Sequence, residues 1–246
     1  MRADRFECFS ALRESFRRNV ERWSADAGPV AEAQRALAHE LGEDDYEVQT
    51  PVVYNRALDD VDASSDIAWI VVADNPGKRE QLATENRYLV GRSGMMAEAF
   101  FRRELGVDFR RGAVILNKTP VHTPKTAQLR LLVRRCPEAR RLVADSQRFM
   151  ASLLPAFQEA LDAPVWIMGL SELGPKGLFA EWRAALEEAW SVLDPGLRGR
   201  AYAFNHFSMG SFATDLKRRR LPGETARDAV LRIGAENRNR IFAAHV

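Results

Sequence analysis

Three polar side chains stand at the ends of short apolar runs, and their types could stabilise a leaving group. Asn75, Asn117 and His206 each follow a run of strand length. An asparagine cannot act as a general base, so it orients a water or binds a polar edge, whereas a histidine can donate to a developing anion. Because neither a nucleophile nor a set of metal ligands accompanies them, we expect a reaction that depends on leaving-group stabilisation.

A second pattern lies between the first two of these residues. Gly91, Arg92, Ser93 and Gly94 open a segment with helical spacing, and Ser93 has the chemistry of an N-cap. The free N–H groups at a helix start suit a phosphate. Asp74 adds a carboxylate beside Asn75, which could be an additional acid-base group, although we expect it to be a solvated turn residue.

The elements that position these residues alternate between strand and helix. Such alternation predicts a three-layer α/β/α fold around a central, mainly parallel sheet of four strands. Parallel strands bring their carboxyl ends to one edge of the sheet, where ligands bind. The expected strands are 67–73, 112–117, 164–169 and 200–206, and the expected helices between them are 93–105, 137–161 with a break at Pro155, and 178–193.

The flanking segments predict additional helices around the same core. Apolar residues at steps of three and four predict helices at 5–23 and 30–41 and a helical segment over 224–245, while 48–55 could form an edge strand. We expect a single domain over 1–246. Its parts are a helical extension over 1–45, a core over 50–215 and a C-terminal helical segment over 216–246.

Composition limits the possible partners. The apolar runs are too short to cross a bilayer and the N-terminus lacks a signal-peptide pattern, so we expect a cytoplasmic protein without membrane contact. Cys8 and Cys136 are far apart and the histidines are scattered, so we expect no metal and no other cofactor. The net charge of +2 does not by itself predict a polyanion partner, and the arginine clusters at 130–141 and 217–220 are typical of solvated faces.

Four motifs in order resemble the uracil-DNA glycosylase superfamily over about residues 50–215. The first resembles the family's Asn-Pro-Gly motif, the second its Phe-Val-Gly-x-x-Gly element, the third its strand ending in a base-reading asparagine, and the fourth its His-Pro-Ser segment. The cysteines of the iron-sulfur branches are absent. The matching segments are Ala73–Gly77, Leu89–Gly94, Ile115–Asn117 and His206–Ser208.

The resemblance implies a DNA glycosylase that removes uracil or a related deaminated base and leaves an abasic site. Asn75 would position the attacking water, and His206 would donate to uracil O2 as the glycosidic bond breaks. Asn117 would pair with N3–H and O4 of uracil, a pattern that cytosine reverses at position 4. The partner would be DNA with the damaged base flipped out of the stack, and we expect a monomer.

The resemblance also implies contacts around the base. Leu89 stands where the family stacks an aromatic ring, and neighbouring Tyr88 could replace that ring; Asp74 lies beside the water site. Met209 or Phe212 could wedge into the DNA stack. Flanking phosphates would be held by Gly91, Arg92, Ser93, Gly94 and Ser208.

Two departures from the family keep other functions open. Leu89 replaces the stacking phenylalanine and Phe207 replaces the proline of His-Pro-Ser. With the arginine clusters, these changes would also fit a non-catalytic nucleic-acid-binding protein of the same fold. A third hypothesis is an enzyme that acts on a nucleoside or nucleotide.

Overall fold

The structure, a computed structural model, describes residues 1–43 and 45–242, apart from the side chain of Met209. A parallel sheet lies at its centre, with strand order β2-β1-β3-β4. This confirms the predicted fold class. The strands are β1 (Trp69–Ala73), β2 (Ala113–Asn117), β3 (Val165–Met168) and β4 (Ala201–Phe204).

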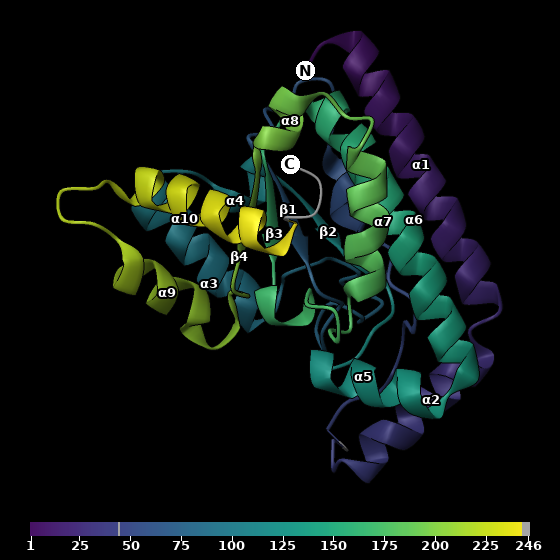
Figure 1. The fold of residues 1–246 in the computed structure, drawn as a ribbon. Helices are drawn as coiled ribbons and strands as arrows, with labels where there is room; N and C mark the ends of the chain where they lie inside the picture. The colour runs from purple at the N-terminus through teal and green to yellow at the C-terminus, as the bar shows by residue number, and fades with distance from the viewer. Residues whose placement is uncertain (44, 243–246) are drawn as a thin grey trace.

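Helices cover both faces of the sheet and complete the three layers (Figure 1). One face carries α3 (Arg92–Phe100), α9 (Ser211–Arg219) and α10 (Ala226–Ile241), and the other carries α1 (Ala3–Ala25), α6 (Pro137–Leu161) and α7 (Ala180–Trp190). The remaining elements are α2 (Gly28–Glu40), α4 (Phe109–Gly112), α5 (Thr126–Arg135), α8 (Pro195–Gly199), the 3-10 turns Arg56–Asp60, Leu170–Glu172 and Ser208–Gly210, and the π-helical turn Phe101–Leu105.

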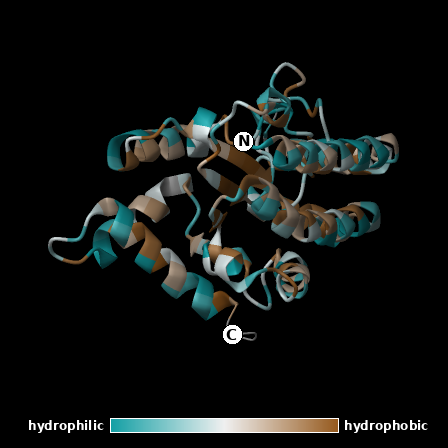
Figure 2. Cartoon of the chain, turned by 90° about the horizontal axis from the view of Figure 1, so that it is seen from above, coloured by the Kyte–Doolittle hydropathy of each residue, from teal (hydrophilic) through white to brown (hydrophobic). Residues whose placement is uncertain are grey.

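The core forms because every strand is apolar along almost its whole length. All five residues of β2 and all four of β3 are buried, as expected for strands covered on both faces. Figure 2 shows the hydrophobic strands enclosed between helices whose outer sides are polar. The ring of Trp166 of β3 lies 4.9 Å, centroid to centroid, from Phe101, which follows α3, and from Phe204 of β4, so aromatic contacts join neighbouring strands to each other and to the end of α3. None of the described helices combines the length and apolar character of a membrane span.

Three local predictions were wrong. Residues 48–55 form no strand, and only an isolated antiparallel bridge joins Val52 to Val121. The helix α6 continues through Pro155, because packing of its flanks against α1 and α7 outweighs the lost backbone hydrogen bond. The helix α3 begins after Gly91, not Ser93, and ends at Phe100, where a π-helical turn leads to Gly106 in the left-handed conformation.

Candidate functional site

The predicted site residues lie at the carboxyl edge of the sheet, around the point where the chain reverses direction. The chain passes from β1 to β2 and then crosses back to β3 on the other side of β1, so the switch point lies between β1 and β3. Crevices at such points are the usual ligand sites of open parallel sheets. Asp74 follows β1, Gly169 follows β3, and Asn117 ends β2 beside Ala73 in the sheet register.

A buried ion pair occupies this switch point. Lys118 Nζ lies 2.5 Å from Asp74 Oδ1 and donates a second hydrogen bond of 2.5 Å to the Met168 carbonyl oxygen. The lysine side chain has no exposed surface and packs over the Phe179 ring at 4.8 Å. Burial lowers the pKa of Lys118, while Asp74 opposes that shift. The expectation that Asp74 is a solvated turn residue is therefore wrong, because its carboxylate is the counter-ion of a buried ammonium.

The backbone of Gly169 makes room for the Asp74 carboxylate. Gly169 has a φ of 85°, and a Cβ built at this position would lie 2.4 Å from Asp74 Oδ1. Both the left-handed conformation and the close approach therefore require glycine. The carboxylate consequently lies directly against the end of β3.

Asn75 is fixed by hydrogen bonds from the segment that follows β2. Its Nδ2 donates to the Thr123 hydroxyl at 3.0 Å and to the Thr123 carbonyl oxygen at 3.2 Å. The Thr126 hydroxyl lies 3.3 Å from both Asn75 Oδ1 and Asp74 Oδ2. With the amide nitrogen committed to Thr123, Oδ1 is the atom of Asn75 that retains acceptor capacity for a water.

Unlike Asn75, Asn117 has an amide group without a hydrogen-bond partner among the described residues. The residue is 1% exposed, and neither Oδ1 nor Nδ2 bonds any described residue. Within the described residues, Asn117 is the only buried amide side chain that lacks a partner on both atoms. A buried amide without partners costs about 1 to 3 kcal/mol for each unmet group. An acceptor and a donor on a ligand, placed side by side, would remove that cost.

His206 presents a single defined nitrogen to the site. Its Nδ1 accepts from the Ser208 backbone N–H at 3.2 Å and lies 3.0 Å from the Ser208 hydroxyl. Because Nδ1 accepts, the neutral imidazole carries its proton on Nε2. Burial lowers the pKa of His206, with Asp74 raising it and Lys118 lowering it by smaller amounts. The lowered pKa favours the neutral imidazole, which can donate from Nε2.

A buried glutamate that the sequence analysis did not single out joins two loops of the site. Glu80 accepts from the Gly77 N–H at 3.2 Å, and the nearby backbone N–H groups of Leu89 and Gly91 also favour its ionised form. Burial raises the pKa of Glu80 to about 7, although these hydrogen bonds and Arg110 oppose the shift. Glu80 thus connects the turn after Asn75 to the start of α3.

A buried histidine supports the same turn from the other side. His122 has no exposed surface, and its Nδ1 donates to the Pro76 carbonyl oxygen at 2.9 Å. Burial lowers the pKa of His122 to about 4. Since Pro76 follows Asn75 directly, this contact fixes the backbone next to the predicted water-positioning amide.

Gly94, in the first turn of α3, allows close packing against the preceding loop. A Cβ on Gly94 would lie 1.3 Å from the Leu89 carbonyl oxygen, which also accepts from Arg110. This contact accompanies the unusual left-handed conformation of Leu89, whose φ is 52°. Gly91, Arg92 and Ser93 keep some exposure, so the predicted phosphate contact there stays a prediction.

The structure shows the surroundings of most residues predicted to contact the base or insert into the DNA stack. Tyr88 is 1% exposed and its hydroxyl donates to the Val53 carbonyl oxygen, and Leu89 is 2% exposed, so neither offers a free face to a base here. Phe212 is also buried, with its ring centroid 4.8 Å from that of Phe100, so it has no free face here and its predicted insertion into the DNA stack stays a prediction. The Met209 side chain lies outside the described part. Ser208 holds His206, and its predicted phosphate contact stays a prediction.

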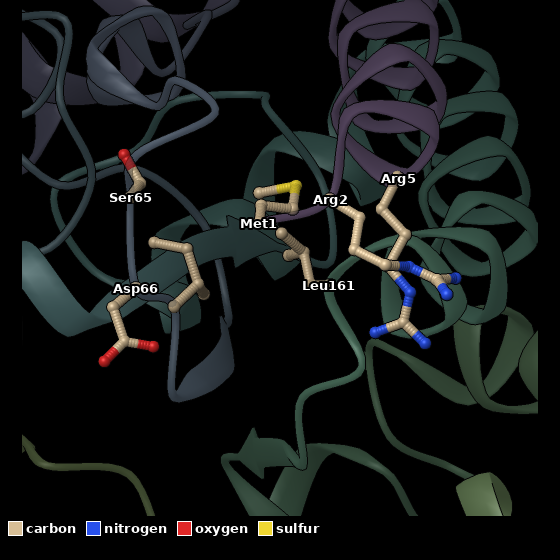
Figure 3. A pocket seen from close by; sticks show the side chains of 7 residues that line it. Met1, Arg2, Arg5, Ser65, Asp66 and Leu161 are labelled. Atoms are coloured by element: carbon tan, nitrogen blue, oxygen red, sulfur yellow. The ribbon is translucent and has the colours of Figure 1, made fainter.

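A separate cavity in the described part of the chain has a different lining. A cavity of about 560 Å³ lies at the opposite end of the sheet, lined by Arg2, Arg5 and Asp66 (Figure 3). Arg2 pairs with Asp4 and Arg5 with Asp162. Within the described residues, no three His, Cys, Asp or Glu side chains gather in a way that could hold a metal ion.

The sequence contains a weak signal for the buried lysine and the buried histidine of the site. Lys118 directly follows a fully buried strand and His122 lies four residues later, but lysine is normally exposed, so residue type alone predicts a surface position. Glu80 carries no sequence signal of burial.

No protein-family model matches this chain, and a search of curated proteins brings no match.

Proposed function

We propose that the chain is a monofunctional DNA glycosylase that hydrolyses the N-glycosidic bond of uracil or a related deaminated base. The observation that carries this proposal is the partnerless amide of Asn117, buried at the carboxyl end of a central strand. Uracil presents a donor at N3–H next to an acceptor at O4, which are the complements of the amide oxygen and nitrogen. Cytosine has an acceptor at N3 and a donor at position 4, so in the amide orientation that pairs with uracil it would place acceptor against acceptor and donor against donor.

The other site residues would take complementary roles. His206 Nε2–H would donate to O2 of the base as negative charge develops there, and a neutral imidazole can do this at pH 7. Asn75 Oδ1 would align the water that attacks the sugar. Because the Asn117 amide atoms are fully covered, the base would reach them only after the loops beyond the strands part, so binding would include an opening step.

Base release from labelled oligonucleotides tests the proposal. Strands that contain uracil, hypoxanthine or xanthine, single and paired, are incubated under single-turnover conditions, and abasic sites are then cleaved with alkali. We expect His206→Ala to slow release about 100- to 1000-fold, the typical cost of losing one donor to a developing anion. We expect Asn117→Ala to reduce the preference for uracil over cytosine.

Two variants serve as controls. Asn19→Ala and His39→Ala alter the same residue types on α1 and α2, outside the site, and should release base at the unmodified rate. Release that is equal in all variants would indicate a contaminating glycosylase and refute the assignment.

The second candidate is a nucleic-acid-binding protein without catalysis. The burial of Tyr88 and Leu89 favours it, because no aromatic face from this segment is free to stack on a base. It predicts salt-dependent DNA binding without base release on any lesion. Release of base from free nucleosides but not from DNA would instead support a nucleoside-acting enzyme.

A further inference from the structure

A second cavity lies next to the His206 loop. It has a volume of about 470 Å³ and is bounded by α9, the C-terminal end of α10 and the loops that follow β3 and β4. Asn205, one of its lining residues, directly precedes His206. Any group held in this cavity would therefore lie beside the loop that carries the proposed donor. The polar lining residues are Ser171, Asn205, Asp215, Arg218, Arg219 and Arg240.

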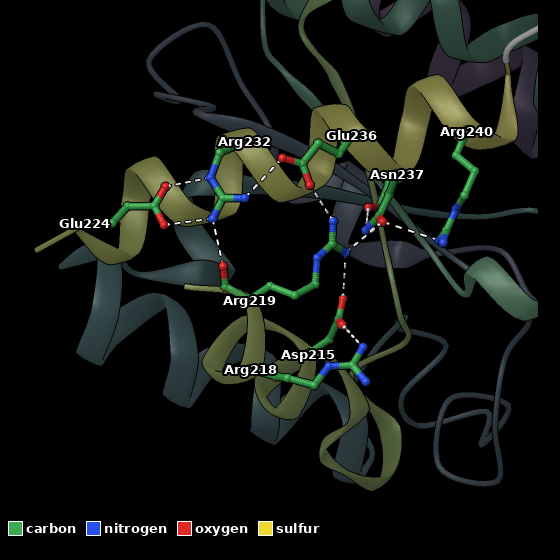
Figure 4. Close-up of polar contacts among 9 residues, drawn as sticks. Asp215, Arg218, Arg219, Glu224, Arg232, Glu236, Asn237 and Arg240 are labelled. Carbon is green, nitrogen blue, oxygen red and sulfur yellow. Dashed lines mark hydrogen bonds and ion pairs between the residues drawn. The ribbon is translucent and has the colours of Figure 1, made fainter. Parts of the chain in front are cut away.

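The three arginines of this cavity are not equivalent. Arg219 is fully engaged, because it pairs with Asp215 at 3.2 Å and Glu236 at 2.6 Å and bonds Asn237 at 2.9 Å (Figure 4). It links α9 to α10 and has a structural role. The remaining two arginines determine what the cavity can bind.

Arg218 and Arg240 are available to a ligand. Arg218 is 77% exposed and shares its only carboxylate partner, Asp215, with Arg219. Arg240 is exposed and makes one long hydrogen bond of 3.4 Å to Asn237, with no carboxylate of the described residues within 4.0 Å (Figure 4). The Ser171 hydroxyl and the Asn205 amide make no hydrogen bond to any described residue, so they add free donors to the lining.

We propose that this cavity binds a backbone phosphate of the DNA strand that carries the target nucleotide. Two guanidinium groups with free donors, a hydroxyl and an amide supply the positive charge and the donors that a phosphodiester requires, and the one lining carboxylate, Asp215, is itself paired with two arginines. The inference rests on the proposed function for the identity of the strand. It adds a positively charged contact on the His206 side of the site, where the sequence motifs predicted only Ser208.

DNA binding measured without any cleavage tests this site. Fluorescence anisotropy with an undamaged labelled oligonucleotide gives the affinity at several salt concentrations for the unmodified chain and for Arg218→Ala/Arg240→Ala. Each phosphate contact contributes about 0.9 to the slope of log affinity against log salt on duplex DNA. We expect the double variant to bind on the order of tenfold more weakly at moderate salt and its slope to fall by about one.

The matched control removes two positive charges elsewhere. Arg18 and Arg35 are exposed residues of α1 and α2 without a carboxylate partner in the described part. Arg18→Ala/Arg35→Ala should keep the unmodified slope, and melting temperatures should show that both double variants fold. An unchanged slope in Arg218→Ala/Arg240→Ala, or an equal loss in the control, would overturn the inference.

A competition experiment distinguishes a site for a phosphate of the DNA strand from a site for inorganic phosphate. Inorganic phosphate, added at constant ionic strength, should displace the oligonucleotide only weakly from the unmodified chain. Efficient displacement that the arginine substitutions abolish would identify a site for free phosphate and overturn the strand assignment. If base release fails but the slope changes, the glycosylase proposal is wrong while the phosphate site stands. Base release with an unchanged slope contradicts the phosphate site alone.

Discussion

Replacing Lys118 by methionine should destabilise the protein strongly although the volume of the side chain hardly changes. The substitution keeps the apolar stem that packs over Phe179 and removes the ammonium that faces Asp74. Asp74 is 7% exposed, so its carboxylate would be left almost buried without its counter-ion. The Met168 carbonyl oxygen would lose its lysine donor at the same time.

The magnitude follows from the geometry of the pair. Removing one partner of a buried ion pair typically costs 3 to 5 kcal/mol, about 3 kcal/mol here because Thr126 and residual solvent still contact Asp74. For a chain of this length, 1 kcal/mol lowers the melting temperature by about 2 to 4 °C, so we expect a decrease of roughly 6 to 12 °C.

A double-mutant cycle in urea measures the coupling directly. Asp74→Asn alone leaves Lys118 buried and unpaired, which further lowers its pKa, so this variant should gain stability as the pH rises from 6 to 9. The double variant Lys118→Met/Asp74→Asn has no buried charge and should recover most of the loss, so the coupling energy should be at least about 2 kcal/mol. A loss below about 1 kcal/mol for Lys118→Met, or additive effects in the cycle, would refute this account of the switch point.

Two further outcomes concern the loops that surround the site. The pKa of Glu80 is raised to about 7, so the folded state retains a proton that the unfolded state releases near pH 4.5, and stability should fall between pH 4.5 and 7 by an amount on the order of 3 kcal/mol. Comparing urea unfolding of the unmodified chain with Glu80→Gln isolates this effect from the opposite contribution of His122, and equal pH slopes would contradict it. Gly94→Ala should cost about 3 kcal/mol or more, because its Cβ would overlap the Leu89 carbonyl oxygen, whereas Gly28→Ala, with nothing within 4 Å, should be close to neutral in the same thermal melts.

The fold was predictable because its strands are continuous apolar runs separated by helical periodicity. The runs ending before Asn75, at Asn117 and before His206 predict parallel strands whose carboxyl ends share an edge, and the structure confirms that arrangement. Local rules failed where tertiary packing overrides them. Pro155 lies inside a continuous helix because the packed flanks of α6 compensate for the lost bond, and Pro51 lies in a segment with only an isolated bridge.

The sequence by itself determined which polar residues follow the strands, since strand length and turn chemistry are local properties. Only the tertiary structure decided what those residues do there. Lys118 pairs with Asp74, 44 residues away in sequence, and donates to the Met168 carbonyl oxygen at the end of β3, 50 residues away. Both contacts exist only because the fold brings these segments together. Among the described residues the Asn117 amide remains without partners, and Phe212 lies in the aromatic core. Both outcomes depend on how all the elements pack together, which residue type does not encode.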